Sequence, residues 1–232
     1  MKTAAPIIDV IIPAYNEQDA IGQVIAGIDK TLVRQIVVVD NNSTDGTGPQ
    51  ALQSGAVVLT EKRKGYGSAC LKGMQYLKDH TMPPEIVVFI DGDNSDFPQE
   101  MNKLIAPILH NKADLVIGSR ALGEREKGSM QPQQVFGNWL ATRLLYLFYG
   151  VRFTDLGPFR AITWKKLQQL DMRDKDYGWT VEMQLKAAKK KLVCIEVPVN
   201  YRKRIGISKV SGTVKGTIMA GYKIIITLFK YL

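Results

Sequence analysis

The chain has 232 residues, of which 45% are hydrophobic and 23% are charged, the ordinary balance of a globular protein with one large core. No charge-free apolar stretch is long enough to span a membrane, and the N-terminus lacks the pattern of a signal peptide, so a cytoplasmic protein is expected. The net charge of +9 favours anionic partners such as phosphorylated substrates, nucleic acid or an acidic membrane surface.

The first half of the chain alternates between strand and helix patterns. Nearly continuous apolar runs predict buried strands at residues 7–12, 35–39, 56–59, 85–90 and 113–118. Helical spacing of apolar residues predicts helices at 19–30, 68–78 and 98–110. Gly46 and Pro49 predict a loop after the second strand. This alternation favours an α/β fold with a mainly parallel central sheet flanked by helices.

The second half carries longer apolar segments. We expect a helix at 133–149, a strand at 193–201 and an apolar helix from about residue 214. Cys70 and Cys194 lack metal-ligand spacing and are interpreted as buried free thiols in a reducing compartment.

Polar residues gather where the predicted strands end. They are Asn16, Glu17, the stretches 40–45 and 91–96, Ser119 and Arg120. In open parallel sheets, ligands bind beyond the carboxyl ends of the strands. The pattern therefore predicts a ligand site at this edge of the sheet.

The strongest motif is Asp91-Gly92-Asp93, directly after the strand at 85–90. Two carboxylates this close repel each other unless a cation compensates their charge. Oxygen ligands of this kind suit Mg²⁺ or Mn²⁺. Such an ion would bridge a diphosphate and stabilise it as a leaving group.

Three further motifs fit a nucleotide ligand. After the first strand, Tyr15 offers a ring for a base and Glu17 an acceptor for ribose hydroxyls. Asp40 is placed to read a base edge, although the stretch 40–47 also has the composition of a helix-capping turn. Gly65 permits close backbone approach before a helix N-terminus that favours phosphate.

Together these motifs resemble glycosyltransferase family 2, and within it the polyprenyl- (dolichyl-) phosphate mannose and glucose synthases. The resemblance implies the GT-A fold, an inverting mechanism, a UDP- or GDP-sugar donor and a lipid-phosphate acceptor. It divides the chain into a transferase domain at 1–212, with a nucleotide-sugar half at 1–120 and an acceptor half at 121–212, and an amphipathic helix at 213–232.

The resemblance also assigns roles to residues. Pro13, Tyr15, Glu17 and Asp40 would hold the nucleoside, and Asp91 and Asp93 the metal and diphosphate, with Asp93 at the catalytic centre. Arg120 would meet phosphate after the fifth strand, and the Gly206-Ile207-Ser208-Lys209 loop would close over the donor.

The basic residues near this loop suit the same purpose. Arg202, Lys203, Arg204 and Lys209 surround Gly206, and arginine's planar fork matches phosphate oxygens. We interpret them as a lid that excludes water from the donor, with Arg202 and Ser208 on the acceptor side. A purely structural basic loop is the alternative.

The chain departs from the family pattern at two places. Ser95, followed by Asp96, stands where the family carries a third polar metal ligand, often glutamine. The dolichyl-phosphate enzymes hold the acceptor phosphate with an arginine and a serine, whereas residues 131–138 here contain neither. Arg143 and Arg152 are the candidate substitutes.

The acceptor decides the chemistry. A phosphate acceptor is already anionic, whereas a hydroxyl acceptor needs a general base. Asp155 and Glu182 are the candidate bases, and Glu182 has the alternative of a carboxylate that stabilises a helix N-terminus.

Other functions stay open from sequence alone. The terminal helix fits either a membrane interface or docking onto the domain or a second subunit. A non-catalytic nucleotide-sugar scaffold is a rival to the enzyme. Nucleic-acid binding is disfavoured, because the chain has no recognised module and the acidic strand ends would repel phosphate without a metal.

Overall fold

A computed structural model describes residues 5–206, 226, 227 and 230. Its elements, in chain order, are β1 (Ile8–Ala14), α1 (Gln18–Gly27), β2 (Gln35–Asp40), α2 (Thr47–Gln53), β3 (Val57–Thr60), α3 (Tyr66–Lys78), β4 (Ile86–Phe89), the 3₁₀ helix η1 (Pro98–Glu100), α4 (Met101–Leu109), β5 (Leu115–Ser119), α5 (Pro132–Tyr149), β6 (Arg160–Thr163), α6 (Trp164–Leu170), α7 (Trp179–Lys189) and β7 (Cys194–Pro198). Within this part of the chain, no helix combines the length and apolarity needed to cross a bilayer.

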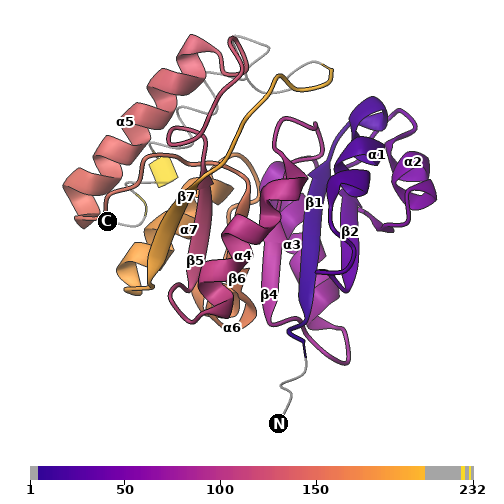
Figure 1. Ribbon diagram of the computed structural model, residues 1–232, viewed down its shortest axis with the longest axis horizontal. Coiled ribbons are helices and arrows are strands. Elements are labelled where there is room, and N and C mark those ends of the chain that lie inside the picture. The colour runs from indigo at the N-terminus through magenta and orange to yellow at the C-terminus, as the bar shows by residue number, and fades with distance from the viewer. Residues whose placement is uncertain (1–4, 207–225, 228–229, 231–232) are drawn as a thin grey trace.

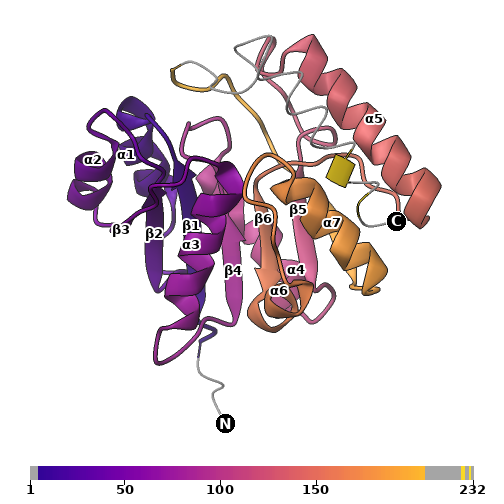
Figure 2. The same ribbon diagram turned by 180° about the vertical axis from the view of Figure 1, so that it is seen from behind.

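The seven strands form one sheet in the order β3-β2-β1-β4-β6-β5-β7. Strand β6 runs antiparallel to both of its neighbours, β4 and β5, whereas the other pairs are parallel. The predicted mainly parallel α/β sheet is therefore confirmed. Figures 1 and 2 show helices on both faces of this sheet.

Alternate residues of the buried strands belong to two hydrophobic cores, one on each face of the sheet. Ile11 and Val37 point into one core, which α3, α5, α6 and α7 cover. Val10, Ile12 and Val38 point into the other, beneath α1, α2 and α4. Because both faces are covered, these strands are apolar along nearly their whole length, and this is why they could be predicted from sequence.

Two predictions about local structure were wrong or incomplete. The loop expected around Pro49 is the helix α2, in which Pro49 lies in the first turn, where its missing N–H costs no hydrogen bond. Strand β6 and helix α6 were not predicted, because four and seven residues give too short a pattern. The predicted terminal helix at 213–232 and its boundary with the transferase domain fall almost wholly outside the described residues.

Candidate active site

An acidic cleft of about 250 Å³ opens at the carboxyl ends of β1 and β4. It is lined by Pro13, Ala14, Tyr15, Glu17, Asn41, Lys64, Gly65, Tyr66, Ala69, Asp91, Gly92, Asp93, Tyr177 and Arg204. We call this set the acidic cleft. It lies at the sheet edge that the sequence predicted for the ligand.

The first wall of the cleft follows β1. The Tyr15 hydroxyl accepts a hydrogen bond of 2.8 Å from Lys64 Nζ, and the same ammonium lies 4.6 Å from the centre of the tyrosine ring. Glu17 is buried and accepts 2.8 Å from Arg204 Nη2. An aromatic ring, a carboxylate and two cations therefore meet on one side of the cleft.

Asn41 shapes the second wall by holding the loop between β3 and α3. Its amide donates to the carbonyls of Glu61 (3.1 Å) and Arg63 (2.6 Å) and accepts from Gly65 N (2.7 Å). Gly65 has φ +144°, and a Cβ there would lie 2.2 Å from the Lys175 carbonyl. Glycine is required at position 65 because the loop between β3 and α3 and the loop that holds Lys175 are in contact through their backbones.

Asp40 was predicted to read a base edge, but the structure does not bring it into the lining of the cleft. Its carboxylate accepts a 2.9 Å hydrogen bond from Ser43 N. This contact closes the turn after β2, but no side chain among the described residues caps α2 at its N-cap residue Gly46.

Asp91 and Asp93 form the acidic floor. Asp93 Oδ1 accepts from Ser95 N (2.9 Å) and Ser95 Oγ (2.5 Å), while Asp93 Oδ2 lies 3.2 Å from Arg204 Nη1. Within the described residues, the buried Asp91 Oδ1 has no hydrogen-bond partner. Burial, reinforced by the charge of Asp93, raises the pKa of Asp91 to about 7.

These carboxylates fit a divalent cation that shares its shell with a substrate. The described part of the chain gathers no cluster of three acidic, histidine or cysteine ligands. Mg²⁺ is commonly bound by one or two carboxylates together with substrate phosphates and water, and the partnerless Oδ1 of Asp91 is the kind of group a cation would satisfy. The hydroxyl of Ser95, a predicted ligand, instead donates to Asp93 and orients it.

Asp96 lies outside the cleft lining. Both of its carboxylate oxygens are buried without a hydrogen-bond partner among the described residues. Burial, together with the negative charge of Asp91, raises the pKa of Asp96 well above its ordinary value.

Of the three predicted cations that the structure describes after β7, Arg204 alone lines the cleft, where it bridges Glu17 and Asp93. Arg202 donates to the carbonyl of Asn94 and to its side chain. Lys203 pairs with Glu126 at 3.4 Å on the surface. Ser208 and Lys209, the other predicted lid residues, lie outside the described part of the chain.

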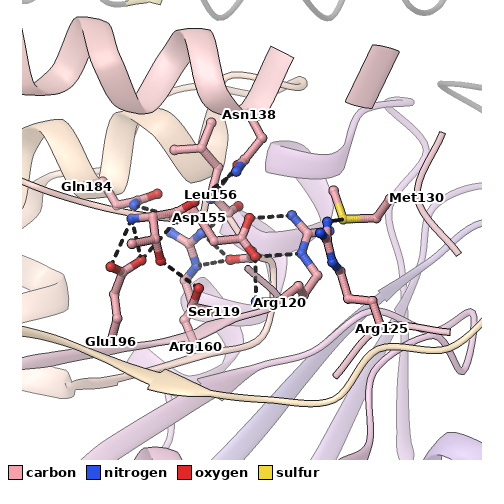
Figure 3. A network of polar contacts seen from close by, with 12 residues as sticks. Ser119, Arg120, Arg125, Met130, Asn138, Asp155, Leu156, Arg160, Gln184 and Glu196 are labelled. Atoms are coloured by element: carbon pink, nitrogen blue, oxygen red, sulfur yellow. Dashed lines mark hydrogen bonds and ion pairs between the residues drawn. The ribbon is translucent and has the colours of Figure 1, made fainter. Parts of the chain in front are cut away.

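On the acceptor side, Arg120 and Asp155 form a buried ion pair (Figure 3). Arg120 donates to Asp155 through Nε (2.7 Å), Nη2 (2.7 Å) and its backbone N (2.8 Å). Burial opposes ionisation of Asp155, but the charge and hydrogen bonds of Arg120 outweigh it, so the pKa of Asp155 is lowered. Neither residue lines the cleft, so the predicted phosphate and base roles would require this pair to open.

Glu182 does not reach the cleft, contrary to its predicted role as a base. It is fully buried in the first turn of α7. Its oxygens accept from the backbone N atoms of Arg173 (3.0 Å) and Asp174 (2.7 Å) and pair with Lys186 at 2.7 Å. The carboxylate holds the loop that precedes α7, a structural role close to the helix-terminus alternative.

Sequence reasoning missed several residues of the lining as site residues: Asn41, Lys64, Tyr66 and Tyr177. Lys64 and Tyr66 belong to the motif around Gly65, and Asn41 belongs to the motif after β2. The sequence therefore indicated these motifs, but not these particular residues. Tyr177 comes from a loop more than a hundred residues away from these motifs, and no local pattern indicates its approach.

The strand order, the single antiparallel strand β6 and an acidic cleft at the ends of β1 and β4 define the GT-A fold of glycosyltransferases. Glucosyl-3-phosphoglycerate synthase from Mycobacterium tuberculosis, solved with Mn²⁺, UDP-glucose and phosphoglyceric acid, shares this fold. The two structures superpose with a TM-score of 0.77, and their sequences are 23% identical. The match covers 98% of this chain and 80% of the synthase chain.

The chain belongs to glycosyl transferase family 2, whose model matches residues 9–170. An uncharacterised glycosyltransferase of M. tuberculosis is 34% identical over 221 residues, which cover 94% of this chain and 95% of that protein. An undecaprenyl-phosphate mannosyltransferase of Micrococcus luteus is 28% identical over 218 residues, or 89% of this chain and 88% of its own length. The sequence-based assignment to this family, with its likeness to polyprenyl-phosphate sugar synthases, is confirmed.

Proposed function

We propose that this family 2 glycosyltransferase is a metal-dependent, inverting enzyme that moves a hexose from a UDP- or GDP-sugar to a polyprenyl phosphate. Its place of work would be the cytoplasmic face of a membrane, as a peripheral protein. The observation that carries the proposal is the acidic floor of the cleft. Asp93 is buried and Asp91 is half-buried two residues before it, and the buried Oδ1 of Asp91 has no hydrogen-bond partner among the described residues.

Different residues of the cleft bind different parts of the donor. Tyr15 stacks the base, and Glu17 accepts hydrogen bonds from the ribose hydroxyls. Asp91 and Asp93 would hold Mg²⁺ or Mn²⁺; when bound, the cation offsets negative charge on the diphosphate leaving group. Arg204 pairs with Glu17 and Asp93 and is the protein's own cation for a phosphate oxygen.

The choice of a phosphate acceptor follows from where the carboxylates lie. Among the cleft-lining residues, Glu17, Asp91 and Asp93 are the acidic groups, and all three are needed for the donor. Asp155 and Glu182 are engaged elsewhere by Arg120 and by backbone amides. An acceptor that is already anionic needs no strong base, whereas a hydroxyl acceptor would.

A hydroxyl acceptor on a lipid or saccharide is the second candidate. The carboxylate that would serve it is Asp155, which is held at the end of β5. There the Arg120 backbone N donates to Asp155, and the hydroxyls of Ser119 and Thr154 are hydrogen-bonded to each other. Its use would require Arg120 to release the carboxylate.

Calorimetric titration of UDP and of GDP, each with and without Mn²⁺, tests the donor site. The wild type should bind one nucleotide in a Mn²⁺-dependent manner, and Asp93→Ala should abolish that dependence. Asp79→Ala, which removes an exposed carboxylate at the end of α3, is the matched control and should bind like the wild type. Folded protein that binds neither nucleotide with metal present would overturn the proposal.

A further inference from the structure

The outer face of α5 exposes large apolar side chains to solvent. Phe136 is 61% exposed, Trp139 55%, Tyr146 40% and Leu147 72%. Their spacing of three, seven and one residues brings all four within about one third of the helix circumference. We call these four residues the α5 apolar face.

This face is built on a helix whose inner side is fixed. Ala141 and Leu145 are buried in the core, and Asn138 bonds to the Thr154 carbonyl (3.0 Å) and to Leu156 N (2.8 Å). Figure 1 shows α5 at the end of the molecule remote from α1 and α2. The apolar face is thus held outward by a helix anchored in the core, and neighbouring large apolar side chains exposed together mark an interaction site.

Charge around the face selects the partner. No acidic residue occurs between Glu126 and Asp155, whereas Lys127, Arg143 and Arg152 lie in that stretch. Both arginines are exposed; Arg143 falls on the same side of the helix as the apolar face, and Arg152 donates to the Tyr146 hydroxyl at 3.2 Å. Exposed apolar and aromatic side chains beside two arginines, on a sequence stretch without carboxylates, match the interface of an anionic bilayer.

We propose that the α5 apolar face docks the enzyme on anionic membranes, with Phe136, Trp139 and Leu147 entering the headgroup boundary and Arg143 meeting lipid phosphates. The inference deepens the proposed function, since a polyprenyl phosphate is anchored in such a surface. Through Asn138, the docked helix is also tied to the loop that carries Asp155 (Figure 3), so the acceptor side of the enzyme would face the bilayer.

Tryptophan fluorescence offers a direct test, because Trp139 is exposed while Trp164 and Trp179, the other two tryptophans, are buried. Vesicles of phosphatidylcholine with phosphatidylglycerol should shift the emission to shorter wavelength, and brominated acyl chains should quench it. Trp139→Phe should remove both effects, and Trp164→Phe should retain them. Vesicles of phosphatidylcholine alone should bind more weakly, since Arg143 then has no anionic headgroup to meet.

Co-sedimentation with the same anionic vesicles measures the binding itself. The double variant Phe136→Ser and Leu147→Ser should partition about tenfold or more weakly, because it removes two large apolar side chains from the contact. The matched control is Leu52→Ser, which changes a 65% exposed leucine on the distant α2 and should bind like the wild type.

Three results would overturn the inference: no vesicle binding, equal binding by the double variant, or a stable dimer in which Trp139 is shielded from aqueous quenchers without vesicles. The last would assign the face to a second copy of the chain. The vesicles contain no donor or acceptor, so these outcomes are independent of the nucleotide titration that tests the proposed function.

Discussion

Two pairs of charged residues near the ends of β4 and β5 have different surroundings. In the acidic cleft, Asp91 and Asp93 carry the same charge, and the pKa of Asp91 is raised to about 7 by burial and by its neighbour. At the end of β5, Asp155 is matched by Arg120, and the pKa of Asp155 is lowered. The first pair has only the half-buried Arg204 as a cation nearby and is the pair that we propose to hold a metal ion, whereas the carboxylate of the second is matched by an arginine fork.

The two surroundings distinguish acids that serve a ligand from acids that stabilise the fold. A buried carboxylate whose charge the protein leaves uncompensated costs stability, and such groups concentrate at sites that bind ions. A buried carboxylate with an arginine fork contributes to the packing of the domain. Each substitution below changes one side of this comparison.

The largest expected effect is on the completed pair. Asp155→Ala leaves the Arg120 guanidinium buried without its partner, which should lower the free energy of unfolding by about 3–5 kcal/mol. Urea denaturation measures this cost. The double variant Arg120→Ala and Asp155→Ala should be destabilised by less than the sum of the single variants; strict additivity would show that the two side chains do not interact.

The opposite pattern is expected in the cleft. Asp91→Asn keeps the shape of the side chain and removes a repulsive charge, so the free energy of unfolding should not fall. Sugar transfer should drop about 10²–10³-fold, the usual loss when one preorganised electrostatic group is removed. Denaturation and transfer assays on one preparation separate the effects, and a destabilised but active Asp91→Asn would reverse the comparison.

Glu182 was a candidate base, but its carboxylate accepts hydrogen bonds from backbone N–H groups and is interpreted as structural. Glu182→Gln should cost about 1–3 kcal/mol of stability through weakened bonds to Arg173 and Asp174. Donor KM should rise, because the same loop carries Tyr177 into the cleft, while the pH profile of kcat should keep its shape. Loss of one limb of that profile would restore the catalytic role.

The smallest effect is expected at Arg204, the internal cation that bridges Glu17 and Asp93. Its side chain is 28% exposed, so the pairing is worth only a fraction of a buried ion pair. Arg204→Gln should therefore strengthen Mn²⁺ binding in the absence of nucleotide by about two- to fivefold. Titration of the free enzyme with Mn²⁺ checks this, and weakened binding would mean that Arg204 does not compete with the metal.

Much of the fold could be predicted because its strands are covered on both faces. Apolar runs such as Ile36 to Val39 have few other interpretations, and the polar residues at their ends mark one edge of the sheet. Strand β6 escaped prediction because it is short, and its buried Arg160 breaks the apolar pattern. That arginine donates to the nearby carbonyls of Leu156 and Gly157 and to the carbonyl of Thr180, which is 20 residues away and is brought near by folding.

The site was predictable to the extent that it is local. Asp91, Asp93, Tyr15 and Glu17 lie in contiguous motifs, and the structure gathers them in one cleft. The partner of Arg120 is distant in sequence, since Asp155 lies 35 residues away. Sequence shows that an acidic or basic residue is present at a strand end, but not whether the fold has already neutralised its charge.

Transfer of labelled hexose from UDP- and GDP-sugars to polyprenyl phosphate in detergent, with chelator and then with added Mn²⁺, tests directly whether Asp91 and Asp93 serve a metal-dependent donor site. We expect labelled lipid from one of the donors only after metal is restored, and none from a folded Asp91→Asn variant. Equal transfer in the presence of chelator, or by Asp91→Asn, would contradict the assignment of Asp91 and Asp93 as the cation site of the donor.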